Sequence, residues 1–162
     1  MKHRSIHIGV AEGAVHAIRE LKASSNGREM CGFLLGRRGE SSIDVQTIRP
    51  AENIYEAKES FAISEKEYAD ALETCRGTAV QIVGIYHTHA DSARPSEQDR
   101  RSIALSSLVW LIAGQSGDGQ QEWRCFLQDG GTIREVPMTC EPTGVHAPAP
   151  ATPSLDLHII RT

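Results

Sequence analysis

The sequence predicts an α/β domain of the α+β type, in which two or three helices flank a mostly antiparallel sheet. Apolar residues recur at helical spacing in two segments, several short apolar runs have the length of strands, and Gly-rich turns separate the later runs. The length of 162 residues suits one domain, and 40% hydrophobic residues can build a core.

The first half of the chain predicts two helices around a hairpin. Apolar residues with a helical period run through residues 10–22, and Ser24-Ser25-Asn26-Gly27 ends that pattern. Residues 31–36 form an apolar run of strand length, with residues 42–48 as a partner strand. Ser64 and Glu67 form a capping box for a second helix, which Gly77 ends. The buried stripe of that helix is expected to contain Tyr68, Ala71, Leu72 and Cys75.

The second half predicts four strands and one helix. A central strand over residues 79–89 is followed by a helix that begins at Ser96. Further strands are expected over residues 108–113, 121–128 and 132–138, separated by Gly-rich turns. We expect a folded domain over residues 1–140. Residues 141–162 are expected to form a Pro- and Ala-rich tail with a short strand-like end.

Composition and charge exclude several classes of function. The net charge is −4, which does not favour binding to nucleic acid or to an anionic membrane. No apolar run approaches the roughly 18 residues of a membrane span, and the N-terminal residues are not typical of a secretory signal. The four cysteines form no Cys-x-x-Cys pair, so we expect reduced thiols in the cytoplasm, although two disulfides are formally compatible with the count.

Two residues at the end of the central strand and one after it have the pattern of a metal site. His87 and His89 are two positions apart, so in a strand both side chains lie on the face shared with Val83 and Ile85. Asp99, at the start of the next helix, can complete a set of two imidazoles and one carboxylate, which is typical of catalytic zinc. Spacing alone leaves a strand-end histidine pair without a metal as the alternative.

Two further residues are candidates for catalysis, and each has a simpler interpretation. Ser96 fits a helix N-cap. Glu29 is a single glutamate before an apolar strand, where most such residues are solvated charges, but a hydrolytic zinc site needs a base that is not itself a ligand.

Both motifs together resemble those of the JAMM (MPN+) zinc metallopeptidases. Glu29-Met30-Cys31-Gly32-Phe33-Leu34-Leu35-Gly36 resembles their Glu-x-Cys-Gly-x-Leu-x-Gly opening, and His87-Thr88-His89 with Ser96 and Asp99 looks like their His-x-His…Ser-x-x-Asp signature. The resemblance covers residues 4–138 and implies a JAMM/MPN-like fold with a curved sheet. It also implies Zn²⁺ held by His87, His89 and Asp99, with Glu29 as general base and Ser96 as a donor to the oxyanion. Cys31 is then expected to pack in the core.

The chain departs from the family pattern in the loop after the second histidine. Ala90 stands where the family usually has proline, and the segment between His89 and Asp99 is one residue shorter than usual. The loss falls before Arg94-Pro95-Ser96, so the Ser-x-x-Asp spacing is kept.

The resemblance also implies a class of substrate. The short chain looks like the compact prokaryotic members, which are similar to enzymes acting on small ubiquitin-like sulfur carriers of the ThiS/MoaD type. We therefore expect hydrolysis of the bond after a C-terminal Gly-Gly, and a homodimer remains compatible with the sequence. The alternatives are a non-catalytic MPN-type scaffold and a zinc hydrolase of another small amide.

Overall fold

The computed structural model describes residues 5–142, which form one eight-stranded sheet with three helices. The strands are β1 (His7–Ala11), β2 (Cys31–Arg38), β3 (Ser42–Ala51), β4 (Gln81–Thr88), β5 (Val109–Gln115), β6 (Gln121–Asp129), β7 (Thr132–Val136) and β8 (Met138–Glu141). The helices are α1 (Glu12–Ala23), α2 (Glu65–Cys75) and α3 (Glu97–Ala104). This confirms the predicted mixed fold with a mostly antiparallel sheet.

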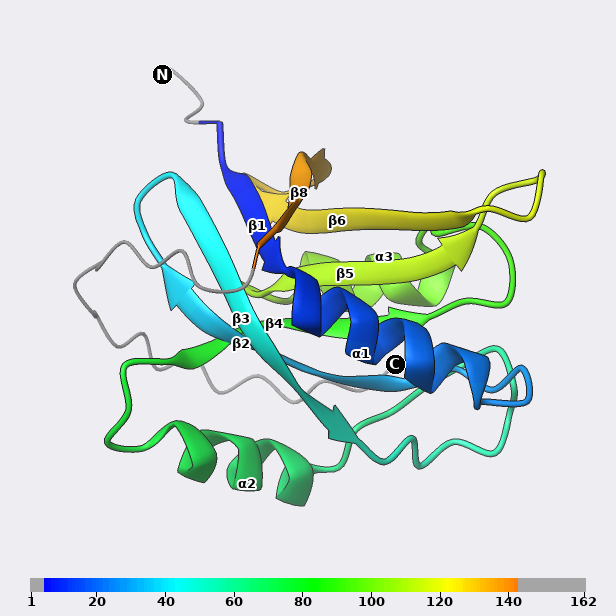
Figure 1. Ribbon diagram of the computed structural model, residues 1–162, viewed down its shortest axis with the longest axis horizontal. Helices are drawn as coiled ribbons and strands as arrows, with labels where there is room; N and C mark the ends of the chain where they lie inside the picture. Colours follow the sequence, from blue (N-terminus) through cyan, green and yellow to red (C-terminus); the bar gives the residue numbers. More distant parts are fainter. Residues whose placement is uncertain (1–4, 143–162) are drawn as a thin grey trace.

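The sheet curls until its two ends nearly meet. Its strand order is β7-β6-β5-β4-β2-β3-β1-β8, so the two outermost strands are consecutive in the chain and only Pro137 separates them. The antiparallel pairs β2–β3, β2–β4, β5–β6 and β6–β7 outnumber the parallel pairs. The resulting near-barrel fixes the ends of β2, β4 and β5 side by side (Figure 1).

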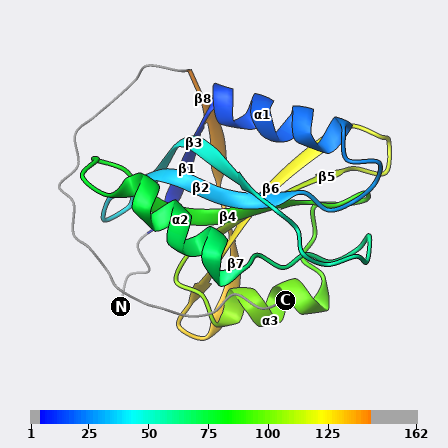
Figure 2. The same cartoon turned by 90° about the horizontal axis from the view of Figure 1, so that it is seen from below.

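Helices cover both faces of this sheet. Helix α1 packs Ala14, Val15 and Ile18 on one face, and α3 lies on the opposite face, where Ile103 is buried (Figure 2). Helix α2 contributes Ala71 to that second cluster. Leu72, which we expected in the buried stripe of α2, is 44% exposed, so that prediction was wrong.

The structure adds two strands that the sequence pattern did not predict. Strand β1 precedes α1 and pairs in parallel with both β3 and β8. Strand β8 includes Glu141, whereas the remainder of the predicted tail, from residue 143 on, lies outside the described residues. Within residues 5–142, no helix has the length and apolar composition needed to cross a membrane.

Candidate metal centre

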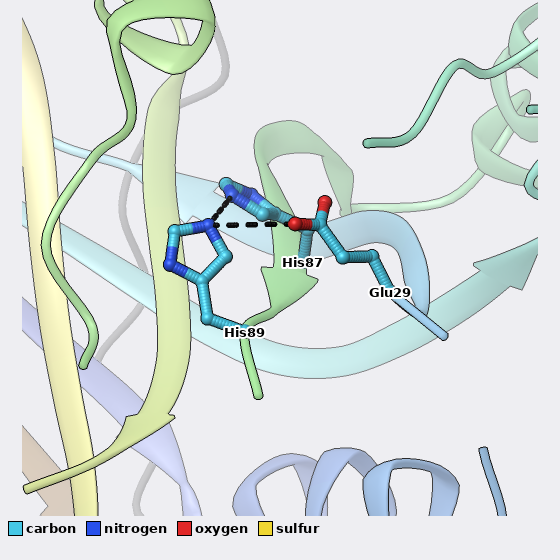
Figure 3. Close-up of side chains that lie close together, drawn as sticks. All are labelled: Glu29, His87 and His89. Atoms are coloured by element: carbon cyan, nitrogen blue, oxygen red, sulfur yellow. Dashed lines mark hydrogen bonds and ion pairs between the residues drawn. The ribbon is translucent and has the colours of Figure 1, made fainter. Parts of the chain in front are cut away.

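Antiparallel pairing of β2 with β4 brings Glu29 next to the two histidines. Because β2 starts where β4 ends, Cys31 pairs with His87. The Met30 carbonyl accepts the Thr88 amide at 2.9 Å, and the Thr88 hydroxyl accepts the Met30 amide at 2.9 Å. Figure 3 shows the side chains of Glu29, His87 and His89 pointing toward one another from these two chain segments.

A bulge in β4 changes which residues share the histidine face. Leu34 pairs with Gly84 and Leu35 with Ile82, so Val83 is an extra residue between them. Ile85 packs in the cluster beneath α2 and α3, as expected, but Val83 packs in the opposite cluster beneath α1. The predicted alternation was therefore wrong at Val83 and correct from Ile85 onward.

Helix α3 positions Asp99 next to the two imidazole rings. Ser96 is its N-cap: the Ser96 hydroxyl accepts the Asp99 amide at 3.1 Å, and Asp99 Oδ2 accepts the Ser96 amide at 2.8 Å. This reciprocal capping box fixes the first turn of the helix, so the Asp99 carboxylate faces the end of β4. Asp99 is only 4% exposed, whereas Ser96 is exposed.

The side-chain distances fit a tetrahedral zinc ligand set. His87 Nε2 lies 3.0 Å from His89 Nε2, and each nitrogen lies 3.2 Å from one Asp99 oxygen. Ligand atoms at about 2.0–2.1 Å from a tetrahedral zinc lie about 3.3 Å apart. Glu29 Oε1 is farther out, at 3.8 Å from His89 Nε2, although the ligand atoms of Glu29 and the two histidines still lie within 4.8 Å of one another. The nitrogens and the Asp99 oxygens therefore have the better separations for a zinc site.

Burial tunes the acidity of Glu29. Desolvation is the largest influence and, against the opposing effect of His89, raises its pKa to about 7. A carboxyl group with a pKa near neutrality can exchange a proton at physiological pH, as a general base must. The Glu29 backbone is also held, because its carbonyl accepts the Asn53 amide group at 3.0 Å.

The pKa values of His87, His89 and Asp99 indicate an ionised Asp99 carboxylate beside the two imidazole rings. Burial lowers the pKa of His87, which keeps that ring neutral. Burial opposes protonation of His89, but hydrogen bonds to Asp99 and to the Ser92 carbonyl outweigh it and raise its pKa. Burial likewise opposes ionisation of Asp99, but hydrogen bonds from both histidines hold its pKa well below the usual range. A buried cluster of this composition is well suited to a divalent cation.

Aromatic side chains close the side of the cluster that faces the core. Phe61 stacks on the His87 ring with centroids 4.6 Å apart, and Trp110 lies edge-on to it at 6.1 Å. Both residues are fully or almost fully buried, as is His87 itself, so this side of the cluster is closed to water. No sequence pattern predicts the Phe61 contact, since Phe61 follows a polar segment without periodicity.

The structure brings Glu29, His87, His89 and Asp99 together and places Ser96 at the adjoining helix terminus. The four cysteines are free thiols. Cys31 is 1% exposed, and desolvation raises its pKa to about 12, which agrees with a packing role.

Comparisons with known proteins agree with this fold and identify its family. The family model described as prokaryotic homologs of the JAB domain matches residues 11–126. The chain is similar to a desampylase from Pyrococcus furiosus, with 29% identity over 119 residues, covering 73% of this chain and 80% of that protein. A protein from Desulfitobacterium hafniense has a solution structure with a TM-score of 0.74 and 25% identity, covering 83% of this chain and 93% of that one. A protein from Salinibacter ruber, with a TM-score of 0.63, 20% identity, and coverage of 87% and 95%, shares the fold. Because the family match spans the helix, the central strands and both signature motifs, this chain belongs to the prokaryotic homologs of the JAB domain, the compact type of the JAMM/MPN family.

Proposed function

We propose that this protein is a zinc-dependent isopeptidase or peptidase that hydrolyses the bond after the C-terminal Gly-Gly of a small ubiquitin-like protein. The observation that supports this most directly is the buried cluster of His87, His89 and Asp99, with Glu29 just outside it. Family membership supports the same chemistry.

In this proposal His87, His89 and Asp99 hold the metal. When bound, zinc supplies Lewis-acid activation of a water molecule and polarisation of the scissile carbonyl. The three residues fix its position from a rigid strand end and a capped helix, so the site does not have to reorganise during the reaction. Phe61 excludes water from the core side of His87.

Glu29 moves the proton. Its carboxylate takes a proton from the attacking water as the oxygen–carbon bond forms, and it returns that proton to the leaving amine as the carbon–nitrogen bond breaks. Acid–base assistance of this kind typically contributes about 10²–10⁴ in rate. The Ser96 hydroxyl uses its oxygen as the acceptor for the Asp99 amide, so its own hydrogen remains free to donate to the tetrahedral oxyanion.

The substrate class is supported by the relative from Pyrococcus furiosus, whose name describes removal of a small ubiquitin-like modifier. We infer that the natural substrate of this chain is a sulfur carrier of the ThiS/MoaD type, located with the enzyme in the cytoplasm. A Gly-Gly tail suits a buried metal centre because glycine lets the peptide backbone approach closely. We also propose that the domain of residues 1–140 holds the metal without the tail of residues 141–162, since every group of the site lies within residues 29–99.

The test is incubation of the zinc-loaded protein with a small Gly-Gly carrier that bears a C-terminal extension, with product masses as the readout. We expect cleavage directly after Gly-Gly by the wild type, and none by Glu29→Gln. Glu59→Gln is the matched control, because it removes the same charge from an exposed neighbouring residue. Zinc binding without any cleavage would overturn the substrate assignment, and absence of both would favour a non-catalytic scaffold.

A further inference from the structure

The short segment between His89 and Asp99 lies against β5. The Ala113 carbonyl accepts the His89 amide at 2.8 Å, and the Asp91 carbonyl accepts the Gln115 amide at 2.6 Å. Gly114 leaves the space for this contact, because a Cβ there would lie 2.4 Å from the Asp91 oxygen and 2.5 Å from the Ala93 nitrogen. The first part of the loop after the second histidine, from His89 to Ala93, is therefore held against the sheet.

Strand β6 adds a side chain to this contact. Glu122 Oε2 accepts the Ala93 amide at 2.9 Å, and Ala93 is completely buried, so this amide takes its hydrogen bond from a protein side chain. The Glu122 carboxylate is itself held, because Arg124 donates to Oε1 from Nε at 2.9 Å and from Nη2 at 2.7 Å. Arg124 also reaches the Glu135 carboxylate, at a longer distance of 3.5 Å.

The peptide group between Ser92 and Ala93 links Glu122 to His89. Its N–H donates to Glu122, and its carbonyl oxygen lies 3.0 Å from His89 Nδ1. A carbonyl only accepts, so Nδ1 carries a proton, and Nε2 is the ring nitrogen that faces His87 and Asp99 and is left to bind a metal. Because a peptide group is planar and rigid, fixing its N–H also fixes the direction of its carbonyl.

We propose that Glu122 is a positioning residue for the metal centre. It touches neither substrate nor metal. Through one peptide plane it holds the Ser92 carbonyl where it selects the tautomer and orientation of the His89 ring. The proposal rests on the proposed zinc function, and it assigns to β6 a role that neither signature motif contains.

The test compares three variants with the wild type. Glu122→Ala removes the acceptor for the Ala93 amide. Glu122→Gln is isosteric and keeps an oxygen that can accept it. Glu135→Ala is the matched control, since it removes the other carboxylate near Arg124 and leaves the Ala93 amide bonded. The readouts are zinc affinity, by competition with a chromophoric chelator, and the ¹H–¹⁵N signal of the His89 Nδ1–H in the metal-free protein, which reports its hydrogen bond to the Ser92 carbonyl.

We expect Glu122→Ala to bind zinc about 10–100-fold more weakly, as is typical when an outer partner of a ligating histidine is lost. The His89 Nδ1–H should also lose its hydrogen bond to the Ser92 carbonyl, which its signal shows as faster exchange with water. Glu122→Gln should recover part of both properties, and Glu135→Ala should match the wild type. Equal zinc affinity in Glu122→Ala and Glu135→Ala would overturn the proposal, and so would weaker binding with an unchanged His89 Nδ1–H signal.

Both readouts are independent of substrate. A wild type that binds zinc but cleaves no carrier would contradict the proposed substrate and leave this comparison intact. A wild type that binds no zinc would contradict the proposed function, and the comparison of the His89 Nδ1–H signals would then decide the role of Glu122.

Discussion

The Ser96 hydroxyl group has one structural contact and one proposed catalytic contact. Its hydroxyl oxygen caps α3 through the Asp99 amide, while the hydroxyl hydrogen is free to donate to an oxyanion. The chain contains a second serine that makes only the first kind of contact, because Ser64 accepts the Glu67 amide at 3.2 Å at the start of α2. The two roles of Ser96 can therefore be separated by experiment.

We predict that Ser96→Ala and Ser64→Ala each lower the free energy of unfolding by about 0.5–2 kcal/mol, the usual cost of a lost N-cap. Only Ser96→Ala should also lower turnover, by about 10²–10³, because it alone removes a donor to the oxyanion. Urea unfolding and carrier cleavage measure the two effects. Similar turnover in both variants would show that Ser96 acts only as the N-cap of α3.

The segment between β3 and α2 is organised by one side chain, Asn53. Its amide group donates to the carbonyls of Glu29 and Ser60, and its oxygen accepts the amides of Tyr55 and Ala62. Every donor and acceptor of the side chain is used. This element therefore carries Phe61 onto His87 and also ties down the backbone of Glu29.

We predict that Asn53→Ala destabilises the fold by about 1–3 kcal/mol, because buried partners lose their hydrogen bonds. It should also speed proteolysis within residues 54–60. Asn53→Asp keeps the acceptor and loses the donors, so its effect should be intermediate. Limited proteolysis with peptide mapping measures this order, and cleavage of Asn53→Ala at the wild-type rate would show that other contacts hold the segment.

The near-barrel buries the thiols of Cys31 and Cys125. Their pKa values therefore depend on the whole fold being intact. Cys31 and Cys125 are each 1% exposed, and desolvation raises the pKa of both, to about 12 for Cys31. An unfolded thiol has a pKa near 9.0, so as the pH rises the unfolded chain loses these protons first. The contribution of each thiol is therefore complete below about pH 9 and falls between there and the folded-state pKa.

We predict that the free energy of unfolding falls from pH 8 to pH 10 and that Cys31→Ala reduces this fall by on the order of 1 kcal/mol. Cys140→Ser should leave the slope unchanged, because Cys140 is exposed. Denaturant titrations at the two pH values give the comparison. An identical slope in Cys31→Ala and the wild type would contradict burial of the Cys31 thiol.

Much of the fold and the candidate cluster could be predicted from the sequence, because their signals are local. The two-residue spacing of His87 and His89 and the capping pattern at Ser96 both lie within one strand end or one helical turn. Strand pairing and β-bulges, in contrast, depend on contacts between residues that are far apart in the sequence. Strand β1 was missed because its five residues are stabilised by parallel neighbours far along the chain, and nothing in the sequence around Val83 marks the bulge. Glu122 was missed for the same reason, since it acts across strands on a backbone amide.

The central claim is that Asp99 holds the zinc and Glu29 does not. The most direct measurement is the zinc content per chain of wild type, Glu29→Gln and Asp99→Asn, each loaded with zinc and then passed through a chelating column. We predict one bound zinc in the wild type and in Glu29→Gln, and little in Asp99→Asn, because Asp99 lies 3.2 Å from both imidazole nitrogens and Glu29 lies 3.8 Å from one. Zinc retained by Asp99→Asn and lost from Glu29→Gln would contradict the account.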